Sequence, residues 1–484
     1  MNFRAIFRLL SVLLLLISLF LLISFLVGLY YHEPKRVLES FLTPILISIL
    51  FFIFMFSISK EKGVPYLSPR SGFLFVALSW ISASALGALP FCLSGAIPSY
   101  TDAFFETMSG FTTTGASILT DIESLPKSIL FWRSTTHWLG GMGIVVLTVA
   151  IFPLLGFGGL HLMEAEAPGP SVDKITPRVA GTAKILWLIY LGFTVIEILL
   201  LMIGGLNLFD ATTHTFGTLA TGGFSPKNSS VGFYKSIYID VVVTLFMLIA
   251  GMNFSLYYKL LKGNIREVVR DSEMKTYLGI FLFASALIAW DLMGKKYASF
   301  GESFRYASFQ AASILTTTGF VTDDYMQWSN FAQVVLFVLF FIGGCAGSTG
   351  GGIKVIRIVT LFKMSITEMK YLIHPRGVFG IFVNGQYLKK NIVYDIAALV
   401  FLYFAIFFIV MIIVATGGYD IMTSVGATIA TLGNIGPGWG KVGPVFNYAF
   451  FPDYIKWVLS LAMLIGRLEV YTITVLLTPM MWRR

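Results

Sequence analysis

The stretch Phe-Thr-Thr-Thr-Gly-Ala-Ser at residues 111–117 recurs in degenerate form along this chain of 484 residues. Its four copies are Thr113-Thr114-Gly115-Ala116, Ala220-Thr221-Gly222-Gly223, Thr317-Thr318-Gly319-Phe320 and Thr431-Leu432-Gly433-Asn434. Each copy has a central glycine and lies between two apolar runs. The copies are too far apart for a solenoid repeat, whose period is about 20 to 50 residues. The repeating unit is therefore a larger module that contains two apolar runs and the glycine segment between them.

The composition indicates the solvent in which these modules fold. Apolar residues make up 56% of the chain and charged residues only 12%, too few to cover the surface of a soluble protein. Runs long enough to cross a hydrocarbon core about 30 Å thick occur along the whole length. We predict ten spans, at residues 9–31, 41–59, 73–93, 129–154, 185–205, 237–258, 277–293, 331–356, 392–417 and 455–477.

Within each module, the glycine segment follows an apolar stretch that is too short to cross a membrane. These stretches are residues 103–112, 211–219, 309–316 and 422–430. Irregular backbone at membrane depth is tolerated only where protein covers it or where it lines water. We therefore expect an all-α membrane protein with ten transmembrane helices and four re-entrant pore half-helices, arranged with pseudo-fourfold symmetry around one pore. The alternative is a set of loops outside the membrane that are similar by chance.

This pattern divides the chain into five units. Residues 1–69 form a two-helix extension, and residues 70–165, 166–268, 269–375 and 376–484 form the four pore repeats. Lys and Arg are more frequent in the segments on the side of the N-terminus, which predicts cytoplasmic termini. The basic segments 354–390 and 259–275 then face the cytosol and are candidate docking surfaces for a regulator, although the positive-inside rule alone explains most of their charge.

The central glycine of each copy suggests a cation filter. Glycine tolerates positive φ, so that successive carbonyl groups can turn toward one axis and replace the hydration shell of an ion. The predicted filter residues are Thr113, Thr114, Gly115, Ala220, Thr221, Gly222, Thr317, Thr318, Gly319, Thr431, Leu432 and Gly433. In three copies a threonine hydroxyl lies two positions before the glycine, whereas Ala220 interrupts this layer.

Acidic side chains near the expected outer mouth would concentrate cations there. These residues are Asp102, Glu106, Asp121, Glu123, Asp210, Asp323 and Asp324. For each residue taken singly, a solvated loop carboxylate is the simpler interpretation.

The segments FTTTGAS, LATGGFS, LTTTGFVT and TLGNIGPG resemble those of the Trk/Ktr/HKT superfamily of potassium transporters, over residues 70–480. The additional N-terminal pair of spans is similar to the TrkH type of pore-forming subunit. The resemblance implies potassium bound at the filter residues without an organic cofactor, and a homodimer with one pore per protomer. It further implies the bacterial inner membrane, contact with lipid, and control by a cytosolic ring of nucleotide-binding subunits of the TrkA type.

The second span of the third module contains six glycines within residues 343–352. A lipid-facing helix would hardly sustain this composition, so we expect the helix to break there. The predicted gating residues are Gly344, Gly347, Gly350, Gly351, Gly352 and Arg467. Close helix packing through Gly343 and Gly347 is the alternative interpretation.

Arg467 is a charge in the middle of the last span, and such a charge usually faces a cavity or a partner. We expect it to act as an electrostatic barrier beneath the filter that also holds the gating loop. A structural ion pair with Glu469 or Glu197 is the alternative.

The sequence favours one of three classes of function. An enzyme is disfavoured, because the five histidines are scattered without metal-ligand spacing and no nucleophile and base occur together. A coupled symporter with protons or sodium would use buried acids, for which Glu197, Asp240, Asp291 and Glu469 are candidates. Nucleic acid is not an expected partner, because the basic residues lie in short loops. The four-loop filter favours a gated, channel-like pathway for potassium uptake.

Overall fold

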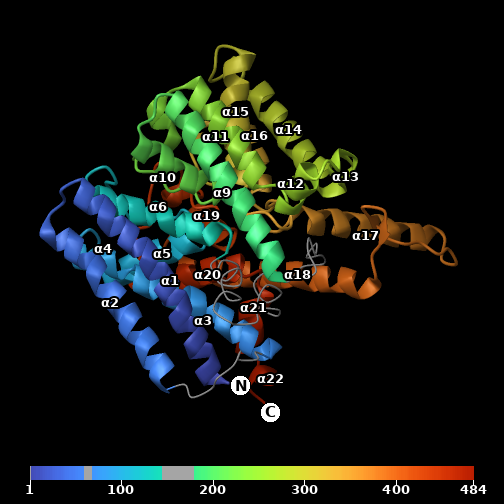
Figure 1. Cartoon of the computed structure of the whole chain (residues 1–484). Helices are drawn as coiled ribbons and strands as arrows, with labels where there is room; N and C mark the ends of the chain where they lie inside the picture. The colour runs from blue at the N-terminus through green and yellow to red at the C-terminus, as the bar shows by residue number, and fades with distance from the viewer. Residues whose placement is uncertain (1, 59–67, 144–178, 484) are drawn as a thin grey trace.

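The structure is a computed structural model that describes residues 2–58, 68–143 and 179–483 (Figure 1). In these residues, six helices are long and apolar enough to cross a membrane, or up to eight if each of two bent pairs is one span. The predominantly helical membrane fold is therefore confirmed. The C-terminal part of the predicted span 129–154 lies outside the described residues.

Two helices precede the modules. α1 (Phe3–Tyr30) and α2 (Lys35–Ile58) pack side by side at the edge of the molecule (Figure 1). α1 also packs on α3 and α6, and α2 packs on α4. This pair therefore forms an extension on the outside of the first module.

The four modules share one order of elements: a long helix, a short helix, an irregular glycine segment and a second helix. The long helices are α3 (Pro69–Gly87), which continues into α4 (Leu89–Ser94), then α9 (Val179–Ile203), α14 (Ser272–Leu292) and α18 (Lys390–Ala415). The short helices are α5 (Tyr100–Phe111), α10 (Leu208–Leu219), α15 (Phe300–Leu315) and α19 (Ile421–Leu432). The second helices are α6 (Lys127–Gly141), α11 (Ile237–Ala250), α16 (Asn330–Leu339) and α20 (Asp453–Arg467).

The remaining described elements connect or follow these helices, and all but α17 are short. They are α12 (Phe254–Leu261), α13 (Ile265–Arg270), α17 (Val355–Ile373), α21 (Tyr471–Thr474), α22 (Pro479–Trp482), the hairpin strands β1 (Phe382–Val383) and β2 (Gln386–Tyr387), and the 3-10 helices η2 (Ser230–Tyr234), η3 (Tyr325–Gln327), η4 (Gly440–Val442) and η5 (Val475–Leu477). α17 is the longest of them, and it projects from the helical body together with the chain that follows it (Figure 1).

Each short helix begins at a polar N-cap residue whose side chain accepts a backbone hydrogen bond. The caps are Ser99, Asn207, Ser299 and Asp420, which accept from the N–H groups of Asp102, Asp210, Glu302 and Thr423. Such a cap satisfies a backbone donor that has no partner within the helix. The Thr423 side chain also donates to Asp420 over 2.6 Å, and this hydrogen bond lowers the pKa of the Asp420 carboxyl.

The second helices break near one equivalent point. The chain bends by 94° between α11 and α12, and by 115° between α20 and residues Tyr471–Leu477. α16 ends at Leu339, and helical structure resumes only at Val355 in α17. The helix break expected at the six glycines is therefore present, and packing through a continuous helix at Gly343 does not apply.

Contacts between modules close into a circle. α6 packs on α10, α11 on α15, and α20 on α5, so that each of these second helices contacts the short helix of another module. The third and fourth modules meet where the Phe340 ring packs 4.2 Å from the Trp439 ring and the Tyr325 hydroxyl donates to the Gly438 carbonyl. This arrangement brings the four glycine segments together.

Candidate functional site

The four glycine segments adopt one backbone conformation. A residue with φ between 52° and 60° comes first in each, namely Thr113, Thr221, Thr317 and Asn434. Two residues later a glycine with φ between 78° and 95° follows, namely Gly115, Gly223, Gly319 and Gly436. The residue between them donates its N–H over 2.8 Å to the carbonyl five positions earlier, in the pairs Thr114–Ser109, Gly222–Gly217, Thr318–Ser313 and Ile435–Ala430.

The same glycines show that the segments form a closed ring. A Cβ atom on each glycine would collide with the carbonyl oxygen of the intermediate residue in the next module. The four collisions are Gly115 with Gly222, Gly223 with Thr318, Gly319 with Ile435, and Gly436 with Thr114. The last pair returns to the first module, so one chain surrounds one axis. The absence of a side chain is required at these positions by both the positive φ and the close approach.

The register of this ring differs from the register predicted from the sequence in two modules. Gly223, and not Gly222, has the positive φ in the second module, and Gly436 has it in the fourth, where Gly433 ends α19 with φ −81°. Thr431 and Leu432 therefore lie in the last turn of α19, and Ala220 is the C-cap of α10. The predicted residues of the first and third modules lie in the ring.

This register also changes the polar layer two positions before the glycine. The second module supplies Thr221 there, whereas the fourth supplies Asn434 in place of a threonine. Asn434 donates from Nδ2 to the Thr114 hydroxyl and to the Met463 carbonyl, each over 2.9 Å. The predicted gap at Ala220 is thus absent, and the exceptional module is the fourth.

Positive φ at a β-branched threonine is a strained conformation that costs about 1–3 kcal/mol. Three of the four ring segments nevertheless contain one. Such strain persists only where surrounding contacts over-determine the conformation, and it concentrates at functional sites. The Thr113 hydroxyl and the Asn434 Oδ1 atom are buried and have no hydrogen-bond partner among the described residues. Both oxygens can therefore accept a hydrogen bond from a water molecule or coordinate a cation within the ring.

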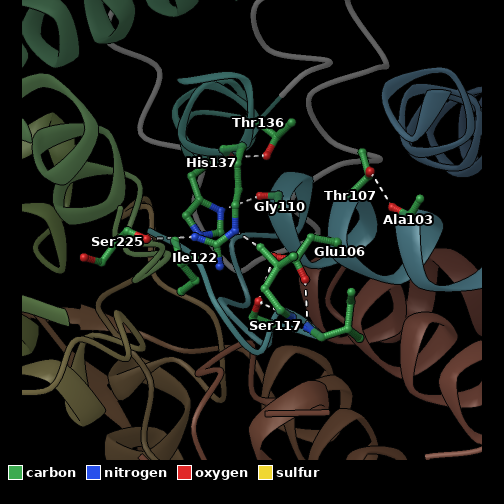
Figure 2. A network of polar contacts seen from close by, with 12 residues as sticks. Ala103, Glu106, Thr107, Gly110, Ser117, Ile122, Thr136, His137 and Ser225 are labelled. Carbon is green, nitrogen blue, oxygen red and sulfur yellow. Dashed lines mark hydrogen bonds and ion pairs between the residues drawn. The ribbon is translucent and has the colours of Figure 1, made fainter. Parts of the chain in front are cut away.

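A buried ion pair holds the ring from outside. Glu106 of α5 lies 2.7 Å from the Nε of Arg133 in α6, and both side chains are buried. The Glu106 carboxylate also accepts from the Ser117 hydroxyl and from the N–H of Ile118, each over 2.9 Å. Figure 2 shows Glu106 reaching the chain that leaves the first ring segment.

Arg133 extends this contact to the second module. Its Nη1 donates to the Ser225 carbonyl over 3.0 Å, and its guanidinium stacks 3.6 Å above the Phe224 ring. His137, one helical turn further along α6, shares a hydrogen bond of 2.7 Å between Nδ1 and the Gly110 carbonyl (Figure 2). Sequence reasoning had placed Glu106 at the outer mouth, because the partner of a lone carboxylate on another helix carries no local signal.

A cavity of about 160 Å³ opens on one side of the ring. Its lining includes the four ring glycines Gly115, Gly223, Gly319 and Gly436, together with the chain that follows them. Four of the acids expected to surround this mouth are in ion pairs, namely Asp102 with Lys456, Glu106 with Arg133, Asp210 with Lys227, and Asp323 with Lys296. Their local fields are partly offset by these cations. Asp121 is exposed, and a hydrogen bond from the Asn228 amide lowers its pKa.

The glycine-rich segment 343–354 closes the other side of the ring. The N–H of Gly351 donates to the Thr317 hydroxyl over 2.7 Å. A Cβ on Gly350 would lie 3.1 Å from the Thr316 carbonyl oxygen, and one on Gly351 would lie 2.7 Å from that of Gly433. The segment therefore packs against the third and fourth ring segments.

Arg467 binds this segment to the first module. Its guanidinium donates to the Thr349 carbonyl over 2.6 Å, and to the carbonyls of Gly140 and Gly141 over 2.6 and 2.8 Å. The alternative partner Glu469 forms an ion pair with Arg357 of α17. The predicted gating residues are thus brought together on one side of the ring.

Comparisons with known proteins agree with this architecture over the whole chain. A sequence model of the TrkH family, described as a cation transport protein, matches residues 45–484. The Trk system potassium uptake protein TrkH of Escherichia coli K12 is 41% identical over 491 residues, and the alignment covers 100% of both chains. The Trk system potassium uptake protein TrkG of the same strain is 35% identical, with 97% of this chain and 96% of the relative covered.

A solved structure agrees equally well. The crystal structure of the potassium transporter TrkH from Vibrio parahaemolyticus has a TM-score of 0.89 to this chain at 38% identity, and 100% of each chain is covered. These relatives are transport proteins and not enzymes, as expected from the sequence. The chain therefore belongs to the TrkH family of cation transport proteins.

Proposed function

We propose that this chain conducts potassium ions into the bacterial cell through one channel-like pore that lies on the axis of the four-segment ring. The observation that carries this proposal is the closed circuit of contacts from Gly115 through Gly223 and Gly319 to Gly436 and back to Thr114. A ring of main-chain oxygens is the type of site that replaces the water around a potassium ion. Potassium is also what the full-length relatives are named for taking up.

The proposed filter follows the register of the ring. It uses the main-chain oxygens around Thr114, Gly222, Thr318 and Ile435, with the side chains of the preceding layer beneath them. Of the residues predicted from sequence, Thr113, Thr114 and Gly115 and their counterparts Thr317, Thr318 and Gly319 keep their role. The buried, unpartnered Thr113 hydroxyl and Asn434 Oδ1 support an ion or its water at the inner end.

The proposed gate is the glycine-rich segment, with Arg467 as its electrostatic partner. Gly350 and Gly351 pack closely against the ring: a Cβ on Gly351 would collide with the Gly433 carbonyl oxygen, and one on Gly350 would be in tight contact with that of Thr316. This packing supports a segment that obstructs the passage of a hydrated ion. The Arg467 charge beneath the ring opposes a cation there. Gly344, Gly347 and Gly352 give the segment the backbone freedom that a movement requires.

The remaining features of the assembly follow the sequence prediction. We place both termini in the cytoplasm, count ten spans and four pore half-helices, and expect a homodimer with one pore per protomer in the inner membrane. The basic segment 354–390, which includes α17 and the hairpin, is then cytosolic and offers a docking surface to a nucleotide-binding regulatory subunit of the TrkA type. The family's naming as a Trk system supports a partner.

The test is to reconstitute the purified chain alone in a planar bilayer and to record current against voltage in mixed potassium and sodium. We expect a current that follows voltage and reverses near the potassium equilibrium potential. Uptake that follows a pH gradient without a potassium gradient would instead identify a proton-coupled symporter. Equal permeation of sodium and potassium would contradict the proposed filter.

A further inference from the structure

One carboxylate binds the chain at two points, one within the glycine-rich segment and one just after it. Glu273, in the first turn of α14, accepts from the N–H of Ala346 over 2.8 Å and from that of Ile356 over 3.0 Å. The same oxygen, Oε1, accepts both hydrogen bonds, and the side chain is only 6% exposed. The eleven residues from Ala346 to Ile356 therefore form a closed loop that is fixed at its base.

The two partners of this carboxylate are Ala346 and Ile356 rather than ring residues, so the filter does not account for these hydrogen bonds. Removing a buried acceptor leaves its donors unsatisfied, and this costs more free energy than a typical hydrogen bond contributes. A single buried acceptor that binds two N–H groups far apart in the sequence also holds these groups close together in space. Any displacement of Glu273 therefore moves Ala346 and Ile356 together, and with them the glycines between these two residues.

The two residues before Glu273 are bound to the tip of the hairpin. Asn384 accepts at Oδ1 from the N–H of Ser272 over 2.7 Å and from its hydroxyl over 2.6 Å. Its Nδ2 donates over 2.8 Å to Asp271, which is the N-cap residue of α14. Asn384 and Gly385 form the two-residue turn of the hairpin, with φ values of 49° and 76°. An Asn-Gly pair is typical of this type of turn.

The hairpin itself is an exposed element. Phe382 and Tyr387 are each 54% exposed, and Val378 before the hairpin is 97% exposed. The hairpin thus presents apolar surface to its surroundings while its turn holds the start of α14. An element of this kind can be displaced by a partner at low cost, because few buried contacts oppose its movement.

We propose that Glu273 is the positioning residue that holds the gating segment against the ring, and that the Asn384 turn is the point at which a displacement of the hairpin reaches it. The sequence of contacts runs from Asn384 to Asp271 and Ser272, then to Glu273, and from there to Ala346 and Ile356. This inference rests on the proposed function, in which the hairpin is cytosolic and the glycine-rich segment is the gate.

The test measures basal rubidium uptake by the reconstituted chain without a regulator. Glu273→Ala removes the one acceptor of both hydrogen bonds and is expected to raise uptake several-fold. Glu273→Gln keeps an amide oxygen that can accept both hydrogen bonds, and it should stay close to the wild-type chain. Asn384→Gly preserves the turn, because glycine tolerates positive φ, but it removes the contacts with α14. We expect a smaller rise for this variant.

Two backgrounds separate the gate from a general loss of structure. With residues 350–352 deleted, Glu273→Ala should cause no further rise, because the segment that it holds is already displaced. The double variant Glu273→Ala with Asn384→Gly should not exceed Glu273→Ala alone, because both act through the same contacts. Asn330→Ala is the control, since Asn330 is exposed at the start of α16 and lies outside this sequence of contacts. We expect uptake by this control to equal that of the wild-type chain.

Unchanged uptake by folded Glu273→Ala, or the same rise with and without the deletion, would overturn the role of Glu273. A double variant whose effect is the product of the two single effects would overturn the role of the hairpin. If Glu273→Ala does not fold, Glu273→Asp, which is one methylene shorter, replaces it with the same expected direction. If the variant with residues 350–352 deleted gives no rubidium uptake, the proposed function is contradicted. If that variant takes up rubidium while Glu273→Ala shows no increase, only the present inference is contradicted.

Discussion

Gly351 donates its backbone N–H to the hydroxyl of Thr317 over 2.7 Å, and this hydrogen bond joins the glycine-rich segment to the ring. Thr317 has a φ of 60°, and its counterparts Thr113 and Thr221 have nearly the same backbone conformation. Of these three threonines, Thr317 contacts the glycine-rich segment through its side chain. In the proposed mechanism, opening the gate frees this hydroxyl, so the state of the gate and the chemistry of the inner filter are linked.

The fit between the segment and the ring can be tested by adding one methyl group. In Gly351→Ala the new Cβ would lie 2.7 Å from the Gly433 carbonyl oxygen and 2.8 Å from the Asn434 Cβ, so the segment must shift. We expect rubidium uptake by the chain alone to rise several-fold. Gly192→Ala is the control, because nothing lies within 4 Å of a Cβ on this glycine of α9. If folded Gly351→Ala takes up no more rubidium than the wild-type chain, the close fit of the segment against the ring does not keep the pore closed.

Arg467 offers a second route to the open state. Arg467→Ala removes hydrogen bonds to three carbonyl groups, of which the bond to Thr349 holds the segment. A hydrogen bond to a charged group contributes about 1.5–3 kcal/mol, and about 1.4 kcal/mol changes an equilibrium tenfold. We therefore expect basal rubidium uptake to rise at least tenfold.

Arg467→Lys separates the charge from the geometry. Lysine keeps the positive charge beneath the ring, but it lacks the planar fork that reaches three carbonyls at once. Uptake by this variant should lie between those of the wild-type chain and Arg467→Ala. Equal uptake by all three proteins would show that neither the charge nor its contacts limit conduction.

The register of the fourth module is decided by a comparison of two glycines. Gly436→Ala places a side chain at φ 95°, where the Cβ would lie 2.5 Å from the Thr114 carbonyl oxygen. We expect this variant to lose discrimination between potassium and sodium, or to lose conduction. Gly433 has φ −81° at the end of α19, and a Cβ there would lie 2.7 Å from the Ile429 carbonyl oxygen of its own helix rather than from an oxygen of another ring segment. Gly433→Ala should therefore disturb the end of α19 but retain more selectivity than Gly436→Ala. The readout is the reversal potential in mixed ions, and the opposite ranking would restore the register that the sequence predicted.

Much of the fold could be predicted from the sequence because its signals are local. The apolar runs, the four glycine segments and the cluster of glycines at residues 343–352 each appear within a short window. The helix break between Leu339 and Val355 follows directly from the glycine content. The position of Arg467 in the middle of an apolar span likewise indicated a special environment.

The register of the ring could not be predicted in the same way. The second and fourth glycine segments can each be aligned with the others in more than one way, because they contain two glycines, at 222 and 223 and at 433 and 436. The choice depends on the hydrogen bond from the residue before the ring glycine to the carbonyl five positions earlier, which leaves no trace in composition. The double contact of Glu273 was missed for a related reason, because its partners are backbone N–H groups far along the chain.

The buried ion pair of Glu106 and Arg133 stabilises the fold around the ring, so its loss can be measured without recording ion flow. Glu106→Ala leaves Arg133 buried with its 2.7 Å partner removed, and loss of one member of a buried pair costs about 3–5 kcal/mol. We expect a clear fall in the thermal unfolding temperature in detergent. Glu39→Ala removes a carboxylate from the exposed pair with Lys35 and should change that temperature little.

The double variant Glu106→Leu with Arg133→Met removes both charges, so it should unfold at a higher temperature than Glu106→Ala. If the double variant is as unstable as Glu106→Ala, an unpaired buried arginine does not account for the loss. The hydrogen bonds of the Glu106 carboxylate with Ser117 and Ile118, and the contacts of Arg133 with Ser225 and Phe224, would then account for it.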